Sequence, residues 1–377
     1  MKIHSLQITP ELLRLIAELD EFKGGWNSIH ALTPERLSAL RHVATIESIG
    51  SSTRIEGVTL TDKEVEELLG RLGTESFKSR DEQEVAGYAE VMEAIFQNYE
   101  LIPLTENYLM QLHSLLLRHS PKDERHRGQY KKLNNHVEAF DSMGKSLGVI
   151  FQTATPFETP RRMEELVRWT SSVLDDRSIH PLLAVGVFTV VFLAIHPFQD
   201  GNGRLSRILT TLLLLKSGYA YVPYSSLESV IERNKEAYYL ALRRTQSSLE
   251  HDSPDWLPWL SFFLRSLKTQ KDHLQVKMAE SRFMNLRLQM NPHFLFNALS
   301  SIQLLIVSEQ TNKAYKYLTV FSNFLRTLLK YAEQSFILLD EELRILRMYI
   351  ELEALRFDNS FEFEIVVDVN IENDEVL

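Results

Sequence analysis

The side chains with the clearest chemical potential lie in one short stretch, which reads His-Pro-Phe-Gln-Asp-Gly-Asn-Gly-Arg-Leu-Ser-Arg from His196 to Arg207. His196 is the nearby group that accepts a proton near neutral pH. Asp200 is a hard oxygen ligand suited to Mg²⁺, the ion that accompanies phosphates. Arg204 and Arg207 share one face of a helix, where two guanidinium groups are able to clamp phosphate oxygens.

The loop between these groups has the composition of an anion site. Gly201 and Gly203 flank Asn202, and glycine lets a backbone turn tightly and approach a ligand closely. An apolar helix expected over about 203–217 points its free amides and the positive end of its dipole back at the loop. A base, a metal ligand, an anion cradle and two cations together predict transfer of a phosphoryl-type group.

The whole string resembles the signature of the Fic (Fido) family, His-Pro-Phe-x-Asp/Glu-Gly-Asn-Gly-Arg-x-x-Arg, at every defined position. That family mostly transfers AMP from ATP to a Ser, Thr or Tyr hydroxyl of a target protein. The resemblance implies that His196 is the catalytic base and that Asp200 holds Mg²⁺ against the α- and β-phosphates. It also implies that the loop 201–203 cradles the anion, while Arg204 and Arg207 bind the β- and γ-phosphates. The expected cofactor is therefore Mg²⁺, with ATP as the substrate.

Two further segments take a role from the same resemblance. Residues 146–157 lie where the family has a flap, which pairs with the backbone of the target protein as an added strand. Tyr238 and Tyr239 lie in a stretch that would border the adenine base, and the alternative is that both are aromatic residues of the core.

A second motif, Ser-Thr-Arg-Ile-Glu-Gly, runs from Ser52 to Gly57 at the end of a helix expected over about 34–56. Ser52 and Glu56 share a helix face, and Gly57 is a natural helix stop. Taken alone this is only a helix end. Beside the first signature it resembles the inhibitory motif of Fic proteins, Ser/Thr-x-x-x-Glu-Gly/Asn, in the class with an N-terminal inhibitory helix. The resemblance implies that Glu56 forms a salt bridge with Arg207, so that ATP binds in a pose unsuited to in-line attack.

A third motif places His293 directly after Asn-Pro in a leucine-rich helical pattern. Proline inside a helix costs about 3 kcal/mol, so this is a kink or a helix start. The segment resembles the phosphoacceptor helix of sensor histidine kinases of the autolysin-regulator type, whose helices dimerise into a four-helix bundle. The resemblance implies a candidate phosphoacceptor at His293 and a homodimer through the C-terminal helices. Because no complete kinase ATP-binding domain follows, we expect either a fragment of a longer protein or a degenerate kinase half that serves to dimerise.

The elements that must position these residues are mostly helices. The stretch 144–160 favours strand by its β-branched residues, and the partly alternating residues 361–369 predict a terminal strand. The expected fold is mainly α: a Fic-type helical bundle with a short β-hairpin flap, followed by a long helical hairpin and a terminal strand. Helices are expected at about 34–56, 62–70, 80–98, 105–119, 160–175, 180–195, 203–217, 228–248 and 255–275, and over much of 278–357, with breaks near 309–312 and 334–335.

Length and pattern divide the chain into three expected regions. Its 377 residues correspond to two or three domains at about 150 residues each. We expect a helical region over 1–100 that carries the inhibitory helix and a catalytic core over 101–270. Over 278–377 we expect histidine-kinase-like dimerisation helices and the start of an incomplete ATPase domain.

Composition excludes several classes of protein. The net charge of −10 argues against general electrostatic binding of nucleic acid, so no nucleic-acid partner is expected. Without cysteine there is no disulfide, thiol catalysis or cysteine-bound metal. The longest apolar run, 182–195, is shorter than the roughly 18–20 residues that cross a bilayer. We therefore expect a buried core helix there, no membrane insertion and a cytoplasmic protein.

These observations lead to one main prediction of function and two alternatives. The main prediction is an autoinhibited protein adenylyltransferase that docks an unknown target protein on the flap. Within the same fold, the alternative is removal of AMP from a modified protein, which also uses the inhibitory glutamate. From another class, the alternative is a signalling scaffold, in which the helical tail relays a phosphorylation state and the Fic module is regulated or silent.

Overall fold

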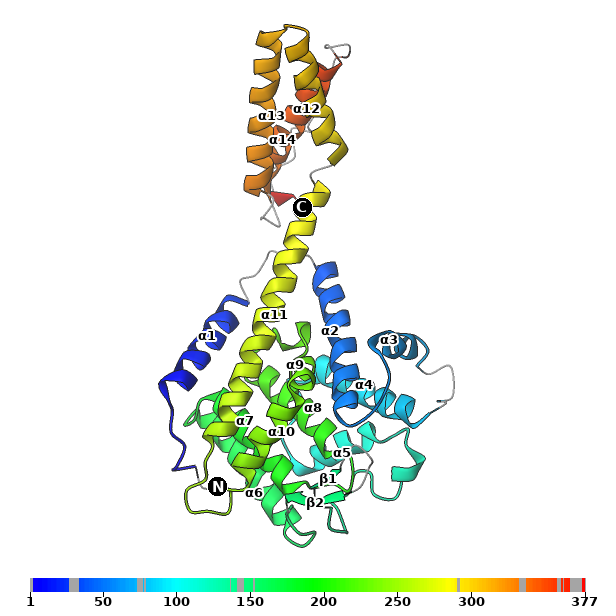
Figure 1. Ribbon diagram of the computed structural model, residues 1–377, viewed down its shortest axis with the longest axis vertical. Coiled ribbons are helices and arrows are strands. Elements are labelled where there is room, and N and C mark those ends of the chain that lie inside the picture. Colours follow the sequence, from blue (N-terminus) through cyan, green and yellow to red (C-terminus); the bar gives the residue numbers. More distant parts are fainter. Residues whose placement is uncertain are drawn as a thin grey trace. The chain divides into compact units, whose positions relative to one another are not determined.

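The computed structural model is mainly helical, and its elements fall into two compact units that are described separately (Figure 1). The first unit takes in the N-terminal helix and Ser38–Leu274, and the second consists mainly of Gln275–Leu377. The helical region expected over 1–100 lies largely within the first unit. The structure describes residues 3–26, 34–72, 77, 79–135, 137–140, 146–151, 153–289, 292–331, 337–357, 361, 363–366 and 375–376.

Several helices of the first unit begin at a residue whose side chain caps the helix. The Thr61 hydroxyl accepts from the Glu64 amide, and the Glu64 carboxylate accepts from the Thr61 amide at 2.8 Å, which forms a capping box. Ser79 and Thr105 also cap helices with their hydroxyls. The helices are α1 (Pro10–Trp26), α2 (Pro34–Ile55), α3 (Asp62–Gly70), α4 (Arg80–Asn98), α5 (Glu106–Leu116), α6 (Thr159–Asp176), α7 (Pro181–Ile195), α8 (Asn202–Lys216), α9 (Leu227–Arg233), α10 (Lys235–Gln246) and the first part of α11 (Leu257–Gln289), with short 3₁₀ helices at Pro121–Asp123 and Val222–Tyr224.

Helix α7 lies in the core of this unit, apolar on all sides and almost completely buried. A helix without a polar face has to be enclosed, and α6 and α8 pack along it. Gly186 lets α11 come close, because a Cβ there would lie 2.7 Å from the Leu260 side chain, and the Trp259 indole donates to the Gly186 carbonyl at 2.7 Å. In the described part of the chain, no helix is long and apolar enough to span a membrane.

Two helix predictions differ from the structure. The helix expected over 228–248 is two helices, α9 and α10, which meet at Asn234. The Asn234 side chain donates to the Val230 carbonyl at 2.8 Å, and such a bond competes with the helical ladder. The helix expected over 255–275 is also longer, because α11 continues past Leu274 without a break. Figure 1 shows α1 lying along the first part of α11, where Glu11 pairs with Arg265.

The two strands β1 (Val137–Phe140) and β2 (Ser146–Phe151) pair as an antiparallel ladder with two irregularities of register. The sequence indicates strand only for the second of them and extends it to Thr155, whereas the ladder ends at Phe151. Beyond it, buried Thr153 accepts a hydrogen bond from Lys131 Nζ at 2.9 Å, which ties this end of the segment to the body of the unit. Residues 141–145, with Gly144 among them, lie outside the described residues.

In the second unit α12 (Pro292–Val307), α13 (Thr311–Tyr331) and α14 (Leu339–Arg356) pack side by side (Figure 1). α12 ends at the break expected near Glu309, whose φ is 59°. The Gln310 amide donates to the Leu305 carbonyl at 2.9 Å, which closes the helix end. The break expected at 334–335 lies outside the described residues. The facing sides of the three helices form an apolar core of Phe294, Ala298, Ile302, Tyr317, Phe321, Phe324 and Leu352.

The terminal strand predicted over 361–369 is wrong for the residues that the structure describes there. Phe361 lies in a bend, and residues 363–366 have no regular structure. The short β3 (Ile337–Leu338) pairs instead with β4 (Glu375–Val376). A strand requires a neighbour for its backbone groups, so an alternating pattern does not by itself produce one.

Candidate active site

The signature loop, residues 196–203, connects the two buried helices α7 and α8. His196 follows α7 with a left-handed φ of 53°, and its amide donates to the Phe192 carbonyl at 2.9 Å. Asn202 clamps the loop, because its Oδ1 accepts from the Phe198 amide at 2.9 Å and its Nδ2 donates to the Phe198 carbonyl at 2.7 Å. Gly201 has a φ of 77°, a conformation that favours glycine, and α8 begins directly after it.

His196 is placed as a neutral base. Its Nδ1 lies 3.4 Å from the Leu193 carbonyl oxygen, and a proton on Nδ1 leaves the lone pair on Nε2. Burial, with the Lys131 ammonium adding to it, lowers the pKa of His196 to about 4. The ring is therefore uncharged at neutral pH. It lines a cavity of about 410 Å³ together with Glu56, the signature loop and residues of α10.

Behind the loop lies a buried cation that the signature does not include. Lys131 is 3% exposed, and its Nζ donates to the Ile195 carbonyl at 3.0 Å, to Asn135 Oδ1 at 2.8 Å and to Thr153 at 2.9 Å. A cation at the C-terminal end of α7 also favours the helix dipole. Asn135 extends the support by donating to the Phe198 carbonyl at 2.6 Å. Burial lowers the pKa of Lys131 to about 8, so the ammonium is mostly charged at neutral pH.

His113 also supports the signature loop, as a neutral group. It is buried, and its ring stacks on Phe198 with the ring centroids 3.9 Å apart. Its Nδ1 accepts from the Gly128 amide at 2.8 Å, which leaves the proton on Nε2 to donate to the Asp200 carbonyl at 3.0 Å. Burial lowers the pKa of His113 to about 4, which keeps this arrangement at neutral pH.

The carboxylate of Asp200 lies in a network of two arginines and a glutamate. Its Oδ1 accepts from the Gly201 amide at 2.6 Å and lies 3.4 Å from Arg204 Nη2, and its Oδ2 accepts from Arg80 Nη2 at 3.2 Å. Glu84 bridges the arginines, 2.7 Å from Arg80 Nε and 2.9 Å from Arg204 Nη1. Burial disfavours the charge on Asp200, but Arg204 and the Gly201 amide outweigh burial and lower its pKa. Asp200 is therefore ionised.

The Asp200 carboxylate on the cavity wall fits Mg²⁺. This ion usually keeps several waters and takes one or two carboxylates together with substrate phosphates. Asp200 meets that description, because its side chain is 36% exposed and lines the cavity. Among the described residues, no three His, Asp or Glu side chains gather to hold a metal ion by themselves. Substrate phosphates would therefore have to complete the coordination.

Arg207 is held by the end of α2. Its Nε donates to Ser52 Oγ at 2.7 Å, and its Nη2 donates to the Ser52 carbonyl at 3.0 Å and to Glu56 Oε1 at 2.7 Å. Arg207 is 4% exposed, and burial disfavours its charge, but the Glu56 carboxylate outweighs burial and raises the pKa of Arg207. The same pairing lowers the pKa of Glu56 despite its own burial. Gly57 follows with a φ of 104°, beyond the end of the helix.

Glu56 also lies directly on the anion cradle. A Cβ at Gly203 would be 2.1 Å from Glu56 Oε1, so the carboxylate occupies the space that a side chain at this position would fill. Gly203 belongs to the first turn of α8, where free amides and the helix dipole attract anions. The carboxylate of Glu56 therefore stands at the place that the sequence predicts for a phosphate.

The two tyrosines expected near the adenine differ in their surroundings. Tyr238 is 2% exposed, and its ring centroid lies 5.8 Å from that of Trp259 and 5.9 Å from that of Phe262. Tyr239 is 42% exposed, and both tyrosines line the cavity. Tyr238 is thus mainly an aromatic residue of the core, while contact of Tyr239 with a base stays a prediction.

Family models match two parts of the chain. The model of the Fic/DOC family matches residues 103–214, which include the signature loop and both signature arginines. The chain contains a Fic domain. The histidine kinase model matches residues 281–361, so the Fic domain is joined to a histidine-kinase-like segment.

Curated relatives of the Fic domain are protein adenylyltransferases. The protein adenylyltransferase Fic of Drosophila grimshawi is 28% identical over 211 residues, which cover 55% of this chain and 40% of that protein. The protein of the same name from Drosophila mojavensis is 29% identical over 213 residues, which cover 55% of this chain and 38% of that protein. The chain thus spans about two fifths of the length of these relatives.

Solved structures share the fold of the Fic domain. A Fic family protein from Desulfovibrio desulfuricans G20 aligns with a TM-score of 0.57 at 28% identity, over 73% of this chain and 76% of that chain. A Fic domain-containing signaling protein from Bacteroides thetaiotaomicron aligns with a TM-score of 0.54 at 25% identity, over 69% of this chain and 97% of that chain. Fic-1 from C. elegans, at 17% identity and a TM-score of 0.57, has a similar fold.

The sequence predicts the residues of the signature loop but not the side chains that support this loop through hydrogen bonds and ion pairs. Lys131 is followed by a second lysine, and Arg80 and Glu84 have the spacing of a solvent-exposed pair, so no local signal marks them. His113 lies in an ordinary amphipathic helix. Of the residues expected in the tail, His293 lies in the first turn of α12, and its side chain is outside the described part of the structure.

Proposed function

We propose that this chain is an autoinhibited protein adenylyltransferase, which transfers AMP from ATP to a Ser, Thr or Tyr hydroxyl of a target protein. The observation that carries the proposal is the neutral His196 in the same cavity as the first turn of α8. Attack of an alcohol on the α-phosphate requires a proton acceptor and a site that stabilises phosphate charge. The Fic domain and the similarity to protein adenylyltransferases support this assignment.

In the proposed reaction, Nε2 of His196 takes the proton of the target hydroxyl. The hydroxyl oxygen forms a bond to the α-phosphorus, the bond from that phosphorus to its bridging oxygen breaks, and pyrophosphate leaves with the electron pair. Arg204 and Arg207 would bind its charge. The buried Nε of Arg204 has no hydrogen-bond acceptor among the described residues, and a phosphate oxygen would supply one. Asp200 would hold Mg²⁺, which when bound neutralises part of the charge of the phosphates.

We further propose that the end of α2, residues Ser52 to Gly57, inhibits the transfer. Glu56 accepts a hydrogen bond from the guanidinium of Arg207 and fills the space next to Gly203. A γ-phosphate would therefore compete with Glu56 for both. A charge-assisted hydrogen bond of this kind is worth about 1.5–3 kcal/mol. ATP would therefore bind either in a displaced pose or only after Glu56 has moved.

The end of α2 is itself anchored to the core by Arg54. Its Nε and Nη2 donate to the two carboxylate oxygens of Glu232 at 2.7 Å and 3.1 Å, and its Nη1 donates to Asp62 at 2.9 Å. This fork holds the last turn of α2 against α9 and α3. Release of these contacts is the step that would free Glu56 to leave the cradle.

The target protein would dock on the β1–β2 hairpin and the segment that follows it, residues 146–157. A backbone with open hydrogen-bonding groups on a strand edge accepts an added strand. Phe157, at the end of this segment, is 94% exposed and would offer an apolar contact to a partner. The Lys131–Thr153 hydrogen bond ties this surface to the loop that holds His196.

The second unit would form a homodimer through α12. One face of α12 packs in the core of the unit, while the opposite face exposes large apolar side chains: Phe296 (69%), Leu299 (52%), Leu304 (67%), Ile306 (61%) and Val307 (74%). A helix that is apolar on two faces requires a second packing partner. Light scattering of the full chain at micromolar concentration is expected to give twice the monomer mass. A monomer under these conditions would contradict the dimer.

Removal of AMP from a modified protein is the second candidate function, and the place of Glu56 favours it. The carboxylate of Glu56 lies in the same cavity as His196, and each charge affects the pKa of the other. A carboxylate there is able to orient a water molecule for attack on a phosphodiester, whereas AMP transfer is slowed by it.

Labelled ATP distinguishes these functions. We expect the full chain with Glu56→Gly to incorporate label from α-labelled ATP into itself or into proteins of a lysate, and none from γ-labelled ATP. Label from γ-labelled ATP would indicate phosphorylation instead. Faster loss of label from a modified protein with wild type than with Glu56→Gly would indicate removal of AMP.

A further inference from the structure

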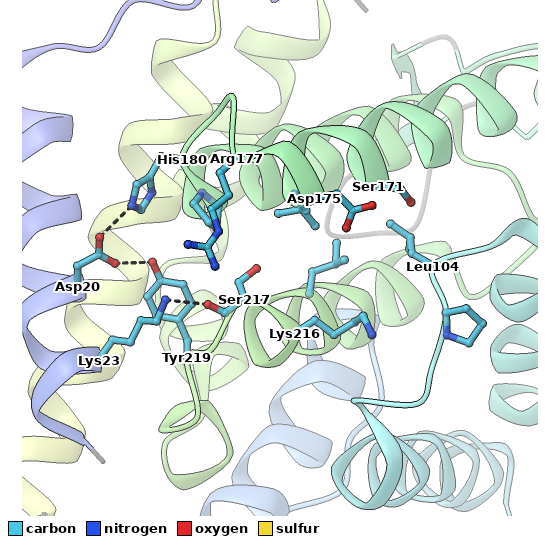
Figure 2. A pocket seen from close by; sticks show the side chains of 14 residues that line it. Asp20, Lys23, Leu104, Ser171, Asp175, Arg177, His180, Lys216, Ser217 and Tyr219 are labelled. Atoms are coloured by element: carbon cyan, nitrogen blue, oxygen red, sulfur yellow. Dashed lines mark hydrogen bonds and ion pairs between the residues drawn. The ribbon is translucent and has the colours of Figure 1, made fainter. Parts of the chain in front are cut away.

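A second cavity of about 790 Å³ lies at the far ends of the two helices that hold the active site (Figure 2). α7 starts here at Pro181 and runs to the signature loop, and α8 returns from that loop to end here at Lys216. The remaining walls come from α1, the end of α6 and the segment before α5. Pockets for small organic molecules typically measure about 300–1,000 Å³. The cavity is therefore large enough for a ligand of that class.

One wall of this cavity is a closed polar network. The two carboxylate oxygens of Asp20 accept from Tyr219 Oη at 2.6 Å and from His180 Nε2 at 2.9 Å (Figure 2). His180 Nδ1 accepts from the Leu182 amide, which places the ring proton on Nε2. Both oxygens of the Asp20 carboxylate therefore already accept hydrogen bonds from the protein, so Asp20 does not require a donor from a ligand.

The cations of the cavity are not neutralised in this way. Lys23 donates to the Ser217 carbonyl at 2.8 Å and lies 4.5 Å from the centre of the Tyr219 ring. Lys216 donates only to the backbone carbonyls of Tyr99 and Glu100, both at 3.3 Å. Neither ammonium has a carboxylate partner among the described residues.

Arg177 is the most unusual of these cations. It ends α6 with a left-handed φ of 54°, a conformation that a residue with a side chain adopts at a cost. Its guanidinium makes no hydrogen bond or ion pair with the described residues, and Figure 2 shows it extending into the cavity, on the side where Lys23, Ser217 and Tyr219 lie. A left-handed backbone thus presents an unpaired, solvent-exposed arginine in a cavity that Lys23 also lines.

We propose that this cavity binds a small organic phosphate. Arg177 and Lys23 would bind the phosphoryl group, since a guanidinium fork pairs with two phosphate oxygens and a dianion matches two cations. The organic part would lie against Leu104, Leu174 and Leu213, which line the cavity together with two prolines, Ser171 and the acidic Asp175. The volume favours an organic phosphate over free phosphate, which would leave most of the cavity unfilled.

Calorimetric titration of the full chain tests this site, with phenyl phosphate and inorganic phosphate as probes at one fixed ionic strength. We expect phenyl phosphate to bind, inorganic phosphate to bind at least tenfold more weakly, and Arg177→Gln to weaken phenyl phosphate at least tenfold. Lys23→Gln should weaken it as well. The matched control is Arg168→Gln, which removes an exposed arginine of α6 outside the cavity and should leave the affinity unchanged.

Three results would overturn the proposal. The first is an absence of binding by phenyl phosphate to the wild-type chain. The second is equal binding to wild type and to the folded Arg177→Gln and Lys23→Gln variants, which would place the probe elsewhere, for instance at the ATP site. The third is equal affinity for the two probes, which would make the ligand free phosphate. A thermal melt of each variant shows that it is folded.

Discussion

The signature loop and the end of α2 meet at one cavity but are held in different ways. Behind the loop, Lys131 and His113 are buried, and their donors and acceptors have partners within the protein. The end of α2 shares the buried contacts of Ser52 with Arg207, but its outer anchor is Arg54, whose side chain is 22% exposed, beside Glu232 (28% exposed) and Asp62 (49% exposed). Buried, satisfied contacts hold a group in one place, whereas exposed ion pairs contribute about 0.2–1 kcal/mol and are screened by salt. This difference favours the proposal that the loop is fixed and that the end of α2 acts as a releasable inhibitor.

The largest effect should follow from removing the base in the fixed region. In a Glu56→Gly background, His196→Ala is expected to lower AMP transfer by about 10²–10⁴-fold, because a positioned general base contributes that much. ATP binding should change little, since the anion cradle is formed by other residues. Self-modification with α-labelled ATP measures the rate, and calorimetry measures the affinity for ATP. Activity within a few-fold of the background would remove His196 from the mechanism.

The next effect concerns the inhibitor itself. Glu56→Gly should raise AMP transfer roughly 10–100-fold, which corresponds to about 1.5–3 kcal/mol at 1.4 kcal/mol for each factor of ten. Arg207→Ala removes the same ion pair but also a phosphate ligand, so its activity should not rise. A general loss of stability would lower the activity of both variants. A rise in Glu56→Gly without a rise in Arg207→Ala therefore indicates inhibition by Glu56. Equal activity of wild type and Glu56→Gly would make Glu56 only the end of a helix.

A smaller effect should follow from weakening the anchor of α2. Glu232→Gln leaves a hydrogen-bond acceptor for Arg54 but removes the charge of this partly exposed pair. A loss of about 0.2–1 kcal/mol corresponds to a rise in AMP transfer of up to about fivefold. Raising the salt concentration should bring wild type toward the activity of Glu232→Gln. The control is Glu236→Gln, an exposed glutamate on the neighbouring α10. An unchanged rate in Glu232→Gln would mean that the anchor does not limit release.

The smallest effect is expected from mild acid. The pKa of His196 is about 4, below its ordinary value of 6.5, so the proton-accepting form persists as the pH falls from 8 to 6. Activity of Glu56→Gly should change less than about twofold over this interval and decline only toward pH 4–5. The Glu56 charge raises the pKa of His196, so its removal in Glu56→Gly lowers that pKa further. The expected direction of the pH dependence therefore stays the same. Half-maximal activity near pH 6.5 would show that His196 is not buried in the active enzyme.

The sequence predicts the residues that line the cavity better than the side chains that support them. The signature string and the 52–57 motif are local in sequence, and the structure brings Glu56 to Arg207 as expected. The helix break at Asn234 could not be predicted, because it depends on the hydrogen bond that the Asn234 side chain donates to the Val230 carbonyl. Nor could the burial of Lys131, because it is set by packing between segments far apart in sequence.

Gly203 is the position where the proposed inhibitor and the proposed substrate would meet. The missing side chain at this position leaves one space, which the Glu56 carboxylate fills and which a nucleotide phosphate would require. In the proposed mechanism, a substitution at 203 that expelled Glu56 would also expel the nucleotide, so no change at this position would give a constitutively active enzyme. Substitutions that relieve the proposed inhibition are therefore expected on α2 or at its anchors, outside the signature. Loss of control and loss of catalysis would then map to separate parts of the sequence, although Glu56 and Arg207 are in contact in the structure.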